Sequence, residues 1–170
     1  MYTYLHLTFG AILAFLLYLF GVTNNTVLLV LYVLGNIIID LDHLITIFVW
    51  REEPYNTLRS SLLQKNFKKF VQHLREHHKD INRLLLHNYI IFIAITIMYC
   101  STKSIPYINW LLLGVLTHMA IDQIDDIYVV GHLKNWFWFA KKHFNSKFKK
   151  SLILTITIII TLYVTLILNK

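Results

Sequence analysis

The stretch from Gly35 to Ile45, GNIIIDLDHLI, places two aspartates and a histidine inside a long apolar run. A carboxylate at the centre of a membrane helix costs about 2.5–3.5 kcal/mol even on the more permissive insertion scales. Asp40 and His43 are three residues apart, so on a helix they share a face, whereas Asp42 points elsewhere. Imidazole and carboxylate together are typical ligands of Zn²⁺ and related divalent ions, and a bound cation would offset the cost of burial.

A second pair with the same chemistry lies in the apolar run 108–124. His118 and Asp122 are four residues apart, which places both side chains on one helix face, where they can bind one ion. His6 and His87 stand near the beginnings of two further apolar runs. The metal ligands that we expect are His6, Asp40, His43, His87, His118 and Asp122.

Asp42 and Arg83 are the residues that we expect to take part in catalysis. Asp42 could orient a ligand, bridge two ions or act as a general base. Arg83 precedes His87 by four residues, one helical turn, and could bind a phosphate group. Secondary candidates are His78, Asp125, Asp126 and His132.

The elements that position these residues are apolar blocks. Of the 170 residues, 56% are hydrophobic and 15% are charged, against about 45–50% and about 25% in a soluble domain. The blocks cover residues 5–22, 27–50, 84–100, 108–124 and 151–168. The sequence therefore predicts an all-α, polytopic membrane protein with about five transmembrane helices and one amphipathic surface helix. We expect one membrane domain over 1–170, with a core over 1–130 and a basic interfacial segment plus the final helix over 131–170.

Two basic segments separate the blocks. Segment 51–83 carries apolar residues at helical spacing beside lysines, which predicts a basic amphipathic helix lying along the membrane surface. Segments 51–83 and 125–150 together hold fourteen of the sixteen lysines and arginines. The positive-inside rule then places both segments and the N-terminus in the cytoplasm, in a protein integral to the plasma or inner membrane. This charge favours membrane lipids over nucleic acid as partners.

Four motifs occur in the order and spacing of the YdjM-like membrane-bound metal-dependent hydrolases, also described as LexA-binding, inner-membrane-associated proteins. They are YLHLTFGAIL, GNIIIDLDHL, NRLLLHNYI and LLGVLTHMAIDQ, and the resemblance covers about the first 130 residues. Carried over, it marks His6, Asp40, Asp42, His43, Arg83, His87, His118 and Asp122. The chain departs from the family pattern at Ile39 in place of proline, Asn82 in place of histidine, and Leu86 and Asn88 in place of threonine and serine.

The residues and the resemblance together predict a hydrolase with one or two divalent ions, most typically Zn²⁺. Its substrate would be a phosphoester or a lipid-linked molecule at the cytoplasmic leaflet. The alternative is a non-catalytic membrane scaffold or partner-binding protein with a structural metal or polar network. A proton- or ion-coupled transporter is a third class, but the candidate groups cluster in one leaflet and no paired inverted repeat is evident.

Overall fold

The computed structural model describes residues 3–76, 84–102, 104–130, 134–137 and 155–163, and every regular element in these ranges is helical. The prediction of an all-α protein is therefore confirmed. The α-helices are α1 (Thr3–Leu19), α2 (Thr26–Ile38), α3 (Leu41–Val49), α4 (Tyr55–Leu63), α5 (Phe67–Glu76), α6 (Tyr89–Ser101) and α7 (Pro106–Asp125). A π-helical turn η1 (Asp126–Val130), a 3₁₀ turn η2 (Lys134–Phe137) and a helical stretch over 155–163 follow.

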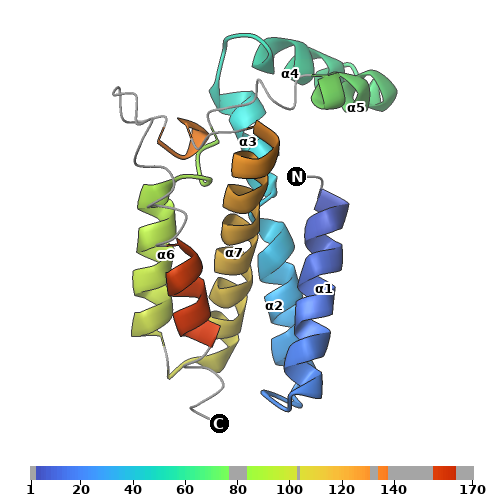
Figure 1. Cartoon of the computed structure of the whole chain (residues 1–170). Helices are drawn as coiled ribbons and strands as arrows, with labels where there is room; N and C mark the ends of the chain where they lie inside the picture. The colour runs from blue at the N-terminus through green and yellow to red at the C-terminus, as the bar shows by residue number, and fades with distance from the viewer. Residues whose placement is uncertain (1–2, 77–83, 103, 131–133, 138–154, 164–170) are drawn as a thin grey trace.

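Helices α1, α2, α6 and α7 run side by side, and the 155–163 stretch lies between α6 and α7 (Figure 1). Local residues begin several of these helices. The side chains of Asn25 and Asn88 accept hydrogen bonds from Val27 N and Ile91 N, which caps α2 and α6. Pro106 opens α7, at a position where its missing N–H costs nothing.

Two glycines allow α2 and α7 to touch backbone to backbone. A Cβ atom on Gly35 would lie 2.0 Å from the carbonyl oxygen of Leu111, and one on Gly114 would lie 2.0 Å from that of Tyr32. Small residues at such crossings let two helices approach more closely than side chains permit. The contact brings the end of α2 beside the middle of α7, where Asn36 donates to the carbonyl of Gly114 at 3.2 Å.

The predicted helix over 27–50 is divided at Ile39 and Asp40 into α2 and α3. The N–H groups of Asp40, Asp42 and His43 bond to carbonyls three residues earlier, at 3.0, 3.0 and 3.1 Å. This winding is tighter than an α-helix, and such stretches within a helix often mark functional positions. Here it separates Asp40, which faces α7, from Asp42, which faces the segment before α6.

The helices expose apolar residues and bury polar ones. Phe15 and Leu19 of α1, Val30 of α2 and Ile97 of α6 are at least half exposed, whereas His118 is fully buried. Among the described residues, only the stretch 26–49 is both long and apolar enough to cross a membrane, and the apolar helices at 5–19 and 89–101 are shorter. The number of five transmembrane helices therefore stays a prediction.

The amphipathic segment 51–83 differs from its prediction as a single helix. It folds into a hairpin of α4 and α5, joined by a turn in which Lys65 has a φ of 56°. The side chain of Asn66 accepts from Lys69 N at 3.1 Å and so begins a new helix. Leu58 and Phe70 close a small core of their own with Ile47 of α3, while residues 77–83 lie outside the described residues.

Candidate metal centre

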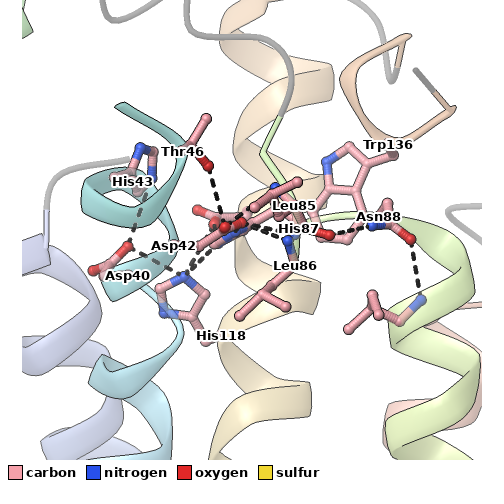
Figure 2. Close-up of polar contacts among 12 residues, drawn as sticks. Asp40, Asp42, His43, Thr46, Leu85, Leu86, His87, Asn88, His118 and Trp136 are labelled. Atoms are coloured by element: carbon pink, nitrogen blue, oxygen red, sulfur yellow. Dashed lines mark hydrogen bonds and ion pairs between the residues drawn. The ribbon is translucent and has the colours of Figure 1, made fainter. Parts of the chain in front are cut away.

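Five of the six predicted ligands meet where α1, α7 and the α2–α3 junction come together, at the end of the bundle near α3. His118 and Asp122 come from α7, and His87 from the segment that leads into α6. His6 comes from α1, and Asp40 from the junction of α2 and α3. Figure 2 shows Asp40, His87 and His118 approaching one another from three separate elements.

The donor atoms of this cluster form two overlapping groups that share His118, and within each group they lie close enough to bind one ion. The Nε2 atoms of His87 and His118 are 3.2 Å apart, and Asp122 Oδ2 is 3.1 Å from each. His6 Nε2 is 2.9 Å from Asp122 Oδ1, and Asp40 Oδ1 is 3.5 Å from His118 Nε2. Ligands bound tetrahedrally at Zn–N and Zn–O distances of about 2.0–2.1 Å stand roughly 3.3–3.4 Å from one another.

The outward-facing nitrogens of two histidines determine which ring atom carries the proton. His118 Nδ1 lies 2.6 Å from the carbonyl oxygen of Asn36, which can only accept. His87 Nδ1 lies 3.1 Å from the carboxylate of Asp42. Both Nδ1 atoms are therefore assigned as donors, which leaves each Nε2 with a bare lone pair. Two lone pairs facing each other at 3.2 Å repel unless a metal ion lies between them or one ring takes up a second proton.

The two carboxylate oxygens of Asp42 accept hydrogen bonds from His87 and from residues that surround it. Its two oxygens accept from the backbone N–H groups of Leu85 at 3.1 Å, Leu86 at 2.6 Å and His87 at 3.2 Å. The hydroxyl of Thr46 donates to Oδ1 at 3.2 Å (Figure 2). Three roles were expected for Asp42. This geometry fits the orientation of His87, because both oxygens of Asp42 are used by its hydrogen bonds and neither points at the Nε2 atoms of the cluster.

Of the remaining predicted residues that the structure describes, His43 lies at the edge of the cluster and Asp126 lies outside it. His43 Nε2 is 3.8 Å from Asp40 Oδ1, and its side chain is 23% exposed, more than any of the five converging residues. Arg83, His78 and His132 lie outside the described residues. Asp126 accepts a hydrogen bond from Trp136 Nε1 at 2.8 Å, and burial raises the pKa of Asp126 to about 6.

Three residues at the site were not anticipated from the sequence. Asn36 supplies the carbonyl that orients His118, and Thr46 helps to hold Asp42. Trp136 is buried and presents its ring edge-on to His87, with ring centroids 6.2 Å apart. Asn36 orients His118 through its backbone carbonyl, so its side-chain type is no signal of this role, and nothing in the sequence connects Trp136 with His87.

Comparisons of the chain with protein families, curated proteins and solved structures found no match. The resemblance to the YdjM-like family therefore stays a prediction from four motifs. The described residues contain two groups that could hold a metal ion, and both include His118. The groups are His6, His118 and Asp122, and Asp40, His87 and His118.

Proposed function

We propose that this chain is a membrane-embedded, metal-dependent hydrolase that acts on a phosphoester or lipid-linked substrate at the cytoplasmic leaflet. The observation that carries the proposal is that the Nε2 atoms of His87 and His118 and the Oδ2 atom of Asp122 all lie within 3.2 Å of one another. Hydrogen bonds from both Nδ1 atoms to fixed acceptors are the arrangement by which proteins orient histidines for a metal. The YdjM-like motifs support the same class of chemistry.

The exposed apolar surface supports the membrane location. Many large apolar side chains are exposed along α1, α2, α3 and α6, and their exposure would be costly in water. They suit lipid, while the polar groups face the inside of the bundle, as intramembrane ionisable residues usually do. We propose that α1, α2–α3, α6, α7 and the helix predicted from the sequence over 151–168 are the transmembrane helices, with the large basic segments cytoplasmic.

A divalent ion bound in this cluster, most typically Zn²⁺, would lower the pKa of a bound water and neutralise charge on a phosphate. The chain's own residues would prepare that chemistry. Asp42 holds His87 in the tautomer that offers Nε2, and the Asn36 carbonyl does the same for His118. His43 stands at the more accessible edge, 3.8 Å from Asp40, and we propose that it exchanges protons with the substrate.

The exposure of the side chains around the cluster supports the proposed substrate class. Exposure of the side chains rises from zero at His6 and His118 through 12% at Asp122 to 23% at His43. Leu41, Leu44 and Ile45 around His43 are all at least 40% exposed. A molecule that reaches the cluster from this side meets apolar side chains first, which suits a lipid carrying a phosphoester headgroup.

A structural metal site in a non-catalytic scaffold is the competing proposal. It is favoured by the burial of His6, His87 and His118, each at most 4% exposed, because structural sites are closed whereas catalytic sites keep a position open for water. The accessible edge at His43 favours the hydrolase.

The two proposals separate in one series on full-length, detergent-purified protein. Wild type, His118→Ala and Asp42→Asn are loaded with Zn²⁺, analysed for metal, and assayed on phosphatidic acid and a chromogenic phosphodiester. The hydrolase proposal expects metal-dependent turnover that is absent in His118→Ala and strongly reduced in Asp42→Asn. Stoichiometric metal without turnover of either substrate class would favour the structural site. No retained metal in wild type would overturn both.

A further inference from the structure

The α4–α5 hairpin has a second apolar side that no described residue covers. Its inner side packs against Ile47, but Leu63, Phe67 and Val71 are 67%, 63% and 44% exposed. Phe67 and Val71 are four residues apart on α5, so they form one continuous strip. Leu63 ends α4 immediately before the turn, so three large apolar side chains project at one end of the hairpin.

The same part of the chain is mainly positively charged. Residues 55–76, which make up α4, α5 and the turn between them, include five basic residues and one acidic residue, Glu76. Lys68 and Lys69 are exposed and lie next to Phe67 in sequence. The basic residues of this stretch are Arg59, Lys65, Lys68, Lys69 and Arg75. Apolar side chains beside exposed lysines on a short helix are the composition of segments that lie in the interface of an anionic membrane.

The hairpin lies across the end of the bundle, where α3 ends and the chain later returns into α6 (Figure 1). If the bundle crosses a bilayer, α4 and α5 therefore run along its surface. Leu84 packs on the small core of the hairpin, and the next three residues are those whose N–H groups Asp42 holds. The position of the hairpin is thus linked through a few residues to His87.

We propose that the α4–α5 hairpin binds anionic lipid headgroups, with Leu63, Phe67 and Val71 inserted among the acyl chains and Lys68 and Lys69 contacting phosphates. This binding sets the metal centre at headgroup depth. The proposal rests on the proposed membrane location but not on the metal centre or on hydrolysis. Each lysine near an anionic surface contributes roughly a fivefold change in the docking equilibrium.

Fluorescent labelling of the full-length chain tests this directly. Cys100 is the lone cysteine and is exposed, so Cys100→Ser provides the background for Phe67→Cys or, on the polar side of α5, Gln72→Cys. Each is labelled with an environment-sensitive dye and reconstituted in nanodiscs of phosphatidylcholine, with or without phosphatidylglycerol. With phosphatidylglycerol we expect a blue-shifted emission at position 67 that spin-labelled lipid quenches, and water-like emission at position 72.

Charge removal gives the second arm of the test. In the Phe67→Cys background, Lys68→Gln with Lys69→Gln is expected to return the emission toward water, as is high salt. Water-like, unquenched emission at position 67 in anionic nanodiscs would overturn the proposal. A blue shift without quenching by lipid would also overturn it, because a second copy of the chain would then cover the strip. Chelation of metal is expected to leave the emission unchanged.

Discussion

Helix α7 buries polar side chains in two regions. The buried polar groups find their partners in different ways in the two regions. In the metal centre, His118 and Asp122 meet other histidines and a carboxylate. In the second region, the hydroxyl of Tyr163 contacts those of Tyr32 at 2.6 Å and Thr117 at 2.9 Å. Nearby, the side-chain oxygen of Gln123 accepts from Tyr89 and Thr155, both at 2.7 Å. This second region, the hydroxyl network, connects α7 to α2, α6 and the 155–163 stretch.

The difference lies in what each group can offer its neighbour. A hydroxyl both donates and accepts, so the hydroxyl groups of this network can satisfy one another. In the metal centre the Nδ1 donors of His87 and His118 point outward to Asp42 and Asn36, so the Nε2 atoms of these two rings face the carboxylate of Asp122 as acceptors. Equal burial therefore has different consequences, because the hydroxyls pair with one another, whereas the two Nε2 atoms and the carboxylate pair only when a metal ion or an additional proton is bound.

Among the changes that distinguish the two regions, removal of metal is expected to change the Tm most. An ion present at about a thousand times its Kd stabilises the folded protein by about 4 kcal/mol. A chelator should therefore lower the Tm of the wild type strongly, in a thermal scan of detergent-purified protein, and leave His118→Ala unchanged. An unaltered wild-type Tm would mean that the metal centre is as self-sufficient as the hydroxyl network.

Gly35→Ala is expected to disturb both regions together, because its new Cβ would lie 2.0 Å from the Leu111 carbonyl oxygen and push α2 from α7. Overpacking of this kind costs about 1–3 kcal/mol. We expect a lower Tm and weaker metal binding, measured on the same preparation. Gly10→Ala is the control, since its Cβ meets only the side chain of Asn36, at 3.1 Å. Equal effects of the two variants would contradict the close crossing.

Asp42→Asn should affect the metal centre alone. An amide cannot accept all the hydrogen bonds that the carboxylate receives from Leu85, Leu86 and His87, and its NH₂ group adds donors to a site that requires acceptors. Loss of such an orienting partner weakens metal binding by about 10–100-fold. Competition with a chromophoric chelator measures this, with Thr46→Val as a milder control that removes one bond to Asp42. If Asp42→Asn bound metal with the affinity of the wild type, Asp42 would not be the residue that orients His87.

Tyr163→Phe should give the smallest effect and confine it to the hydroxyl network. The variant loses the contacts to Tyr32 and Thr117, and such hydrogen bonds contribute about 1 kcal/mol each, or less within a membrane. We expect a slightly lower Tm and the metal content of the wild type. Loss of metal from this variant would show that the two regions are not independent.

Sequence reasoning reached the parts of the site that follow from helix geometry. The i, i+4 spacing of His118 and Asp122 predicts a shared face, and the same argument turns Asp42 away from Asp40. Both placements agree with the contacts in the structure. Helix period says nothing, however, about which backbone groups a neighbouring segment presents. The N–H groups of 85–87 around Asp42 could not be foreseen for that reason.

The misjudged elements have equally local causes. The apolar spacing of segment 51–83 continues through the turn at Lys65, so periodicity alone indicates one helix where α4 and α5 form two. Asn36 in an apolar run looks like a packing residue, because its role is exercised by its backbone carbonyl rather than its side chain. Trp136 reaches His87 only through tertiary packing.

X-ray absorption spectroscopy of the zinc-loaded, full-length protein tests the central claim most directly. A zinc ion bound by His118 with either His6 and Asp122 or Asp40 and His87 predicts a shell of nitrogen and oxygen at about 2.0–2.1 Å with the outer-shell scattering of two imidazoles. His118→Ala, if it retains zinc, should lose one of them. A spectrum with no imidazole contribution, or a wild-type protein that retains no zinc to measure, would contradict the account.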